Sequence, residues 1–154
     1  MRTRRDLFYA WLLATLLSGI PSTVYALVTG ADPLEPPRAA AAMLLREESQ
    51  GWRMFLAATV VHFAVSLFWA VVLWRLLPAR HTMLWALAAS FAIALIDLRL
   101  IAPAFFPEVA ALDFWPQVAD HLMWGACFGA PLAYRAQRAS PRVPPSSGNA
   151  PAAG

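Results

Sequence analysis

Four long apolar segments divide the chain, and polar or proline-rich stretches separate them. The segments are 7–28, 54–77, 82–102 and 117–134. At about 1.5 Å of helical rise per residue they extend roughly 27–36 Å, against a hydrocarbon core about 30 Å thick. The fourth is the shortest and contains Asp120 and His121, so its first turn is the least defined. The pattern predicts an all-α membrane protein whose residues 1–134 form a bundle of four transmembrane helices.

The connections between these segments differ in kind. The tight turn at 78–81 predicts that the second and third helices are antiparallel neighbours. In the first loop, 29–53, Pro37 can start a helix, and residues 38–48 are rich in helix-forming Ala, Leu and Glu. We therefore expect a short helix there that lies at the membrane interface.

The C-terminal residues 135–154 have a different composition from the rest of the chain. They contain four prolines, several Ser and Ala, and no apolar periodicity. Such a segment cannot bury enough apolar surface to order itself, so we expect a disordered tail.

The placement of arginine predicts the orientation in the membrane. With a cytoplasmic N-terminus, eight of the twelve arginines and one acid, Asp6, lie inside. The outer half then holds four arginines and eight acids, so the charges are +7 (8 − 1) inside and −4 (4 − 8) outside, which sum to +3. This predicts a multi-pass protein of the bacterial cytoplasmic (inner) membrane with both termini and the tail in the cytoplasm. The first segment is long for a cleaved secretory signal, and further spans follow it, so we expect it to be retained.

Composition agrees with a membrane protein and narrows the function. The chain is 60% hydrophobic and 14% charged, against about 45–50% and 25% in soluble domains. The arginines form no stripe on one face, which argues against nucleic-acid binding. Cys127 is the only cysteine, so an intrachain disulfide or a cysteine-based metal cluster is excluded. No nucleophile elbow, phosphate-binding loop or metalloprotease motif is present, and we expect no enzymatic activity.

Ionisable side chains inside a membrane segment are costly and are functional candidates. Counted from the outer helix ends, His62 lies about 12 Å deep, Asp97 about 8 Å, and Asp120 and His121 about 5–6 Å. The four helices thus place polar groups at one level, the outer third of the bilayer. The polar layer predicted here comprises Ser22, Thr23, His62, Ser66, Asp97, Arg99, Asp120 and His121.

Four interpretations of this layer compete. The leading one is interhelical hydrogen bonds and ion pairs that fix the bundle. The second is a pathway or site for a small solute or a proton, since His and Asp titrate and line such routes. The third is a metal site made from His62, Asp97, Asp120 and His121. The fourth is a haem held by His62 and His121. The leading interpretations need no cofactor.

His62 carries the sharpest expectation. His62 and Ser66 are four residues apart and share a helix face, which we expect to point into the bundle. A buried imidazole needs a hydrogen-bond partner. Depth favours Asp97 or Asp120 as its charged partner, and Ser22 or Thr23 as its neutral one. His62 should therefore lie within reach of the third or fourth helix.

Small residues recur every four positions, and such rows let helices approach closely. The fourth helix has Gly125, Gly129 and Ala133, and the third has Ala86, Ser90 and Ala94. Packing within one bundle is favoured over a homodimer through Gly125 and Gly129. In the first helix, Pro21 predicts a kink near the polar layer.

Several short motifs resemble those of a set of uncharacterised four-helix bacterial membrane proteins. They are SGIPST at 18–23, GADPLE at 30–35 with RAA at 38–40, HFAVSLFW at 62–69 and QVADH at 117–121. Pro36–Arg38, His62 with Ser66, Phe106–Pro107 and His121–Trp124 are also similar to YagU-type inner-membrane proteins, although the longer first outer loop of that type is missing. The resemblance implies that the polar layer is a family feature, and the YagU likeness implies at most a link to acid tolerance.

Together these observations predict a non-enzymatic inner-membrane protein with a structural or stress-related role. Its polar layer, near the periplasmic side, would hold a small solute or a proton. The alternative is a membrane metal- or haem-binding protein that uses His62 and His121.

Overall fold

The computed structural model describes residues 3–45 and 51–139, and this part of the chain is helical with no β-strand. Three helical segments in it are long and apolar enough to cross a membrane: Arg4–Thr29, Trp52–Leu76 and Thr82–Phe105. The protein is therefore a helical membrane protein, and three of the four predicted spans are found. The fourth predicted span lies in a long helix that is less apolar than these three.

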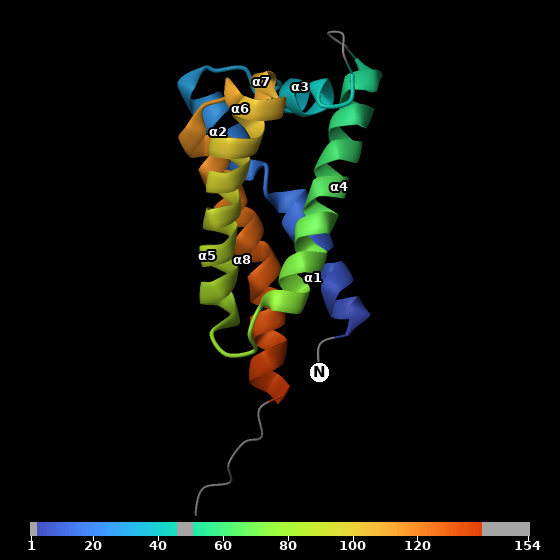
Figure 1. The fold of residues 1–154 in the computed structure, drawn as a ribbon, viewed down its shortest axis with the longest axis vertical. Coiled ribbons are helices and arrows are strands. Elements are labelled where there is room, and N and C mark those ends of the chain that lie inside the picture. Colours follow the sequence, from blue (N-terminus) through green and yellow to red (C-terminus); the bar gives the residue numbers. More distant parts are fainter. Residues whose placement is uncertain (1–2, 46–50, 140–154) are drawn as a thin grey trace, which may run out of the picture.

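The first segment is broken into two helices, α1 (Arg4–Leu17) and α2 (Ile20–Thr29), which Figure 1 draws at different levels of the molecule. Pro21 lies in the first turn of α2, where its missing N–H costs nothing. Two residues, Ser18 and Gly19, form a turn between the helices. The predicted kink is thus a full interruption, because a proline ring would clash with a continuous helix before it.

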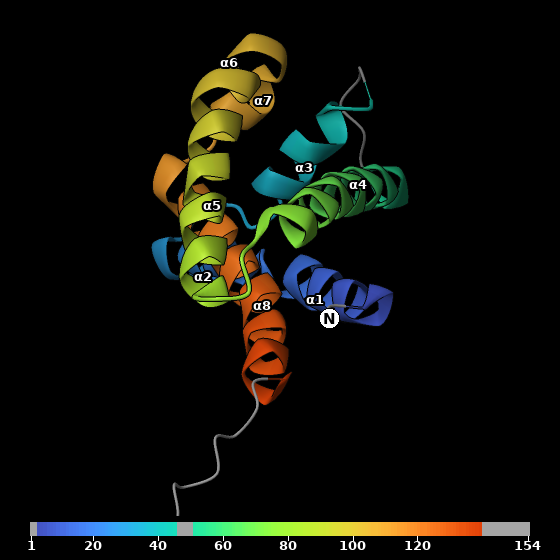
Figure 2. The ribbon, with the colours of Figure 1, turned by 60° about the horizontal axis from the view of Figure 1, so that its bottom comes forward.

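The next two segments are α4 (Trp52–Leu76) and α5 (Thr82–Ile96), and α5 continues through a π-helical turn, η1 (Asp97–Ile101), into α6 (Ala102–Phe105). α4 packs mainly on α1 and on α3 (Glu35–Ala42), whereas α5 packs on α8 (Phe114–Ala139). The two helices meet at the turn that joins them and then diverge in both views (Figures 1 and 2). The prediction that they are antiparallel neighbours is therefore wrong, because α4 packs on α3 and α1 whereas α5 packs on α8.

α3 lies in the first loop, where a short helix was predicted, and begins two residues before Pro37. It packs on α4 and on α7 (Pro107–Ala110). Its buried Ala41 belongs to a small apolar cluster with Met54, Ala57 and Ala58 of α4. The helix ends at Ala42, and residues 46–48 of the predicted helix lie outside the described residues.

α8 is the central helix of the molecule, and α1, α2 and α5 all pack on it. Trp124, Phe128 and Leu132 of α8 are buried in the main core, and the Trp124 and Phe128 rings stack with centroids 5.0 Å apart. A helix covered by other helices needs less apolar surface than one that faces lipid. α8 runs to Ala139, past the predicted end at residue 134, and residues 140–154 of the predicted tail lie outside the described residues.

Two glycines allow α5 to approach α8 closely. A Cβ atom at Gly125 would lie 2.7 Å from the Ser90 Cβ, and one at Gly129 would lie 2.7 Å from the Ala86 Cβ. Real Cβ atoms do not approach so closely, so both positions require glycine. The predicted packing within one bundle accounts for this row. A homodimer through Gly125 and Gly129 would need a surface that α5 already covers.

The elements gather at two ends of the molecule. The N-terminus, the turn between α4 and α5, and the C-terminal end of α8 lie at one end, while α3, α6 and α7 lie at the other (Figure 1). We call these the basic end and the loop end. At the basic end, Arg135 of α8 forms an ion pair of 3.2 Å between its Nε and Asp6 Oδ1 of α1. Asp6 also completes a capping box with Thr3 at the start of α1.

Candidate functional site

Polar side chains between the helices form two separate groups. The first group, which we call the His62 cluster, comprises Thr15 and Ser18 of α1, His62 and Ser66 of α4, and Trp124 of α8. The second group, the Asp97–His121 cluster, joins η1 to α8 and includes Asp120 with its partner Ser22 of α2. The predicted polar layer is thus two clusters, and no hydrogen bond or ion pair of the described residues links them.

The hydrogen bonds of the His62 cluster run in one direction across three helices. Thr15 Oγ1 donates to the Trp11 carbonyl oxygen over 2.7 Å, so its own proton is used and it can only accept from Ser66 Oγ. Trp124 Nε1, which can only donate, then donates to Ser66 Oγ over 2.8 Å. The chain leads from α8 through α4 to α1. Every hydroxyl in it has both a donor and an acceptor, which is how a buried polar group avoids its desolvation cost.

His62 is exposed, whereas Ser66 on the same predicted face is buried, and the hydrogen bonds of His62 go to α1 and the turn after it. Its Nε2 lies 2.9 Å from the Thr15 carbonyl oxygen and 3.4 Å from Ser18 Oγ. A carbonyl only accepts, so Nε2 carries the proton and donates it. Among the described residues, no hydrogen bond joins His62 to the predicted partners Asp97, Asp120, Ser22 and Thr23. The interruption of α1 after Leu17 explains the difference, because the turn brings Ser18 and the last carbonyls of α1 beside α4.

The Asp97–His121 cluster contains the one ion pair found between predicted members of the polar layer. His121 Nε2 lies 3.5 Å from Asp97 Oδ2, and each side chain is about a quarter exposed. His121 Nδ1 lies 2.8 Å from the Gln117 carbonyl oxygen. Both ring nitrogens thus face acceptors, which is the pattern that a doubly protonated imidazolium satisfies. The pair can hold a proton between a carboxylate and an imidazole.

A π-helical turn begins at Asp97, the η1 member of this pair. The turn spans Asp97–Ile101, and the backbone N–H of Ala102 bonds the carbonyl of Asp97 five residues before it. One extra residue per turn changes which side chains face α8. Single π turns inside helices are rare and frequently lie at functional sites. The sequence contains no proline or glycine in this turn, so spacing alone did not predict it.

Asp120 serves as the N-terminal cap of α2. The backbone N–H of Ser22 donates to Asp120 Oδ1 over 2.9 Å, and α2 has no side-chain cap of its own. Because Pro21 lacks an N–H, Ser22 supplies the next backbone donor after Ile20 in the first turn. A carboxylate at this position also interacts favourably with the positive end of the helix dipole. A side chain from α8 therefore caps the helix that starts after the interruption near Pro21.

The remaining predicted members lie at the edge of the cluster. The Arg99 guanidinium lies over the Phe114 ring, 4.0 Å from its centroid, and its side chain is exposed. Thr23 is exposed and bonds the Gly19 carbonyl of its own helix. Neither contacts Asp97 or His121.

The described residues show no geometry that supports the alternative metal and haem interpretations. Among residues 3–45 and 51–139, His, Cys, Asp and Glu form no group of three that could hold a metal ion. His121 directs both ring nitrogens at protein acceptors, which leaves no free lone pair for a metal.

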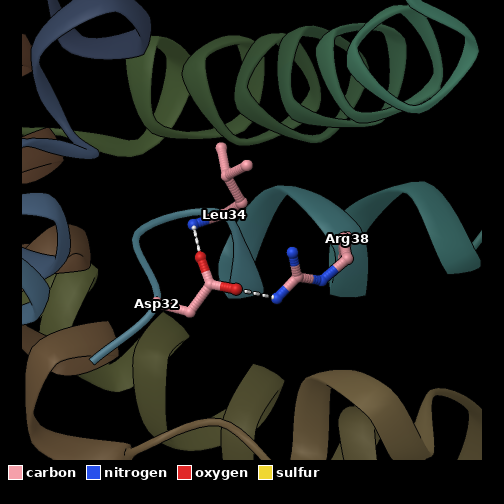
Figure 3. Close-up of polar contacts among 3 residues, drawn as sticks. All are labelled: Asp32, Leu34 and Arg38. Carbon is pink, nitrogen blue, oxygen red and sulfur yellow. Dashed lines mark hydrogen bonds and ion pairs between the residues drawn. The ribbon is translucent and has the colours of Figure 1, made fainter. Parts of the chain in front are cut away.

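The loop end carries a further polar group, drawn in Figure 3. Asp32 accepts a hydrogen bond of 2.8 Å from the backbone N–H of Leu34 and forms an ion pair with Arg38 in α3. The Arg38 guanidinium, and then the Leu34 N–H, hold the pKa of Asp32 below its ordinary value of 3.8. The group fixes the turn that leads into α3, and it is exposed to solvent.

Sequence reasoning missed Thr15, Ser18 and Trp124 as members of the His62 cluster. Each has a helical spacing that could have indicated it. Trp124 lies four residues before Phe128, on the same side of α8, and Ser18, the residue that follows α1, lies three residues after Thr15. The signal was hidden because threonine, serine and tryptophan are common in membrane helices.

Comparisons with protein-family models, with curated proteins and with solved structures found no match. The class of this protein, a helical membrane protein, therefore rests on its own helices, and its function rests on its own clusters.

Proposed function

We propose that α8 is a fourth transmembrane helix and that the protein is a four-span bundle. α8 has 26 residues, which extend about 39 Å at a rise of about 1.5 Å. Its central position between α1, α2 and α5 supports this role, because neighbouring helices, not lipid, meet most of its polar side chains. α3 would then lie near the membrane surface at the loop end.

The same proposal includes the orientation in a bacterial inner membrane, with both termini in the cytoplasm. Supporting it, the N-terminus and the end of α8 lie together at the basic end (Figure 1). The arginines described there outnumber those described at the loop end, six to three: Arg4, Arg5, Arg75, Arg80, Arg135 and Arg138 against Arg38, Arg53 and Arg99. Positive charge is retained on the cytoplasmic side.

For function, the proposal is a non-enzymatic envelope protein with a structural or stress-related role, whose Asp97–His121 cluster is part of a proton pathway that takes up protons and passes them across the membrane. The observation that carries it is the ion pair of 3.5 Å between Asp97 and His121. Ionisable pairs at this position in membrane helices are costly and mark proton relays. The pair lies toward the loop end, on the periplasmic side in the proposed orientation, where it can exchange protons with water.

A matched pair of histidine variants tests this function. Purified protein in proteoliposomes that contain a pH-sensitive dye should conduct protons when a pH gradient is applied. His121→Gln should reduce the initial flux by at least tenfold, because glutamine cannot carry the proton. His81→Gln, in the exposed turn at the basic end, should leave the flux unchanged.

Two results would contradict the function. One is a wild-type flux equal to that of empty liposomes. The other is a His121→Gln protein that conducts normally and differs only in thermal stability, which would assign the pair to bundle packing alone.

A further inference from the structure

The basic end carries a concentrated positive charge that the interior of the bundle does not use. Every arginine described there is exposed: Arg4, Arg5, Arg75, Arg80, Arg135 and Arg138. Asp6 is the one acidic residue described at this end, and it is 5% exposed. The described residues of the end therefore carry a formal charge of +5 (6 − 1).

The ion pair between Asp6 and Arg135 shows which arginines remain available. This ion pair occupies the one acidic residue described at the basic end and one of its guanidinium groups. It also brings the first turn of α1 next to the last turns of α8. Arg4 and Arg5 precede Asp6 directly, and Arg138 lies one turn beyond Arg135. The Arg138 guanidinium lies on the Tyr134 ring, 4.5 Å from its centroid. A stacked guanidinium keeps its N–H edge free, and that edge matches a phosphate group.

The side chains around these arginines fit a membrane boundary. Tyr9, Tyr134, Leu76, Leu84 and Trp85 are all exposed. Aromatic rings of this kind lie at the level of lipid headgroups, and the leucines fit the acyl chains below. The exposed arginines are therefore at the level of the lipid phosphates.

We propose that the basic end binds the phosphate groups of anionic phospholipids in the leaflet it faces, with Arg4, Arg5 and Arg138 as the main contacts. The inference rests on the membrane placement given above. It is independent of the proton site, which lies toward the other end. Each basic side chain near an anionic surface contributes about 1 kcal/mol, which is about a fivefold change in binding.

Quenching of tryptophan fluorescence by brominated lipids tests the proposal on the full chain. Vesicles that contain brominated phosphatidylglycerol or brominated phosphatidylcholine give the relative association constant of the two lipids with the protein surface. The wild type should prefer phosphatidylglycerol by at least about fivefold. The variant Arg4→Gln/Arg5→Gln should show a preference below about twofold. Both leaflets have the same composition, so an inverted orientation of the variant would not affect the result.

Two control proteins make the test specific. Arg38→Gln/Arg53→Gln removes the same charge from the loop end and should keep the wild-type preference. Arg4→Lys/Arg5→Lys keeps the charge and should also keep most of the preference for phosphatidylglycerol. If the glutamine variant folds poorly, this variant still tests the role of charge. Circular dichroism in phosphatidylcholine checks that the variants retain their helix content.

Three outcomes would overturn the proposal. They are a wild-type preference near one, an equal loss in the loop-end control, and displacement of the lipid by millimolar glycerol phosphate. The last would indicate a site for a soluble phosphate compound. A failed proton-flux experiment leaves this inference unaffected, so the two proposals can be separated.

Discussion

Trp124, Ser66 and Thr15 show how individual side chains fix the relative position of three helices. Each can bond only in one direction once Thr15 donates to the Trp11 carbonyl. Removing one member leaves a buried partner unsatisfied, which costs more than the bond contributes. These hydrogen bonds stabilise the packing of the three helices only because every member of the series is paired, since half-satisfied polar networks destabilise a core.

Trp124→Phe should therefore lower the free energy of unfolding by about 1–2 kcal/mol, from the lost donor and the smaller ring. The matched control is Trp85→Phe, since Trp124 is 8% exposed and Trp85 is 53% exposed. Chemical unfolding of the purified protein in mild detergent, followed by circular dichroism, measures both. Equal effects of the two changes would contradict the hydrogen-bonded role of Trp124.

Asp32 gives a pH-dependent prediction at the loop end. The pKa of Asp32 in the folded protein lies below 3.8. The charged carboxylate therefore stabilises the turn before α3 at neutral pH. This stabilisation is lost as the pH falls below 3.8 and through the folded pKa. Arg38→Gln removes the largest cause of the shift and should raise the pKa of Asp32 toward 3.8. A carboxyl titration by NMR measures this directly. A higher wild-type value than that of the variant would contradict the assignment.

Interruptions decide the course of two membrane-length helical segments. The first segment breaks at Ser18–Gly19, and Asp120 closes the start of α2. The third widens into a π turn at Asp97–Ile101. Both interruptions lie beside α8, and both aim polar groups at it. The close approach of α5 to α8 over Gly125 and Gly129 completes this arrangement.

Gly125→Ala tests the close approach. The added Cβ would lie 2.7 Å from the Ser90 Cβ, and such overpacking costs about 1–3 kcal/mol. Gly19→Ala is the control, because nothing lies within 4 Å of its Cβ position. Thermal unfolding in detergent should show a loss for Gly125→Ala alone. The double variant Gly125→Ala/Ser90→Gly should recover part of it, and a failure to recover would place the cost elsewhere.

The molecule as a whole has a basic end and a loop end, and the start of α1 and the end of α8 lie together at the basic end (Figure 1). The arginine distribution then predicts which end faces the cytoplasm. This arrangement separates the two proposals in space. The proposed proton site lies toward the loop end, and the proposed lipid-binding surface lies at the basic end.

Two alanine-to-cysteine changes test this orientation in intact cells that express a Cys127→Ser background. Ala110→Cys, exposed in α7, should react with an impermeant thiol reagent added outside. Ala79→Cys, exposed in the turn between α4 and α5, should react only after the cells are opened. Labelling of Ala79→Cys alone in intact cells would reverse the orientation.

The sequence by itself determined the membrane class, three of the spans and a distortion near Pro21, which it predicted as a kink and the structure shows as a full interruption. These follow from run length, hydropathy and the geometry of proline, which depend on the local chain alone. It also indicated that histidine, aspartate and serine meet between helices. It did not determine which helices meet, because depth gives one coordinate of a side chain and leaves the neighbour open.

The tertiary structure decided those partnerships. His62 bonds to α1 because the break after Leu17 turns the last carbonyls of that helix toward α4. Asp97 meets His121 because α5, whose regular helix ends at Asp97, packs on α8; the π turn that begins at Asp97 precedes Pro103, whose ring would clash with a regular helix before it. α4 and α5 separate because α8 offers α5 a close approach over Gly125 and Gly129, whereas α4 contains no glycine. Each of these contacts joins segments that are distant in the sequence, and only the folded chain brings such segments together.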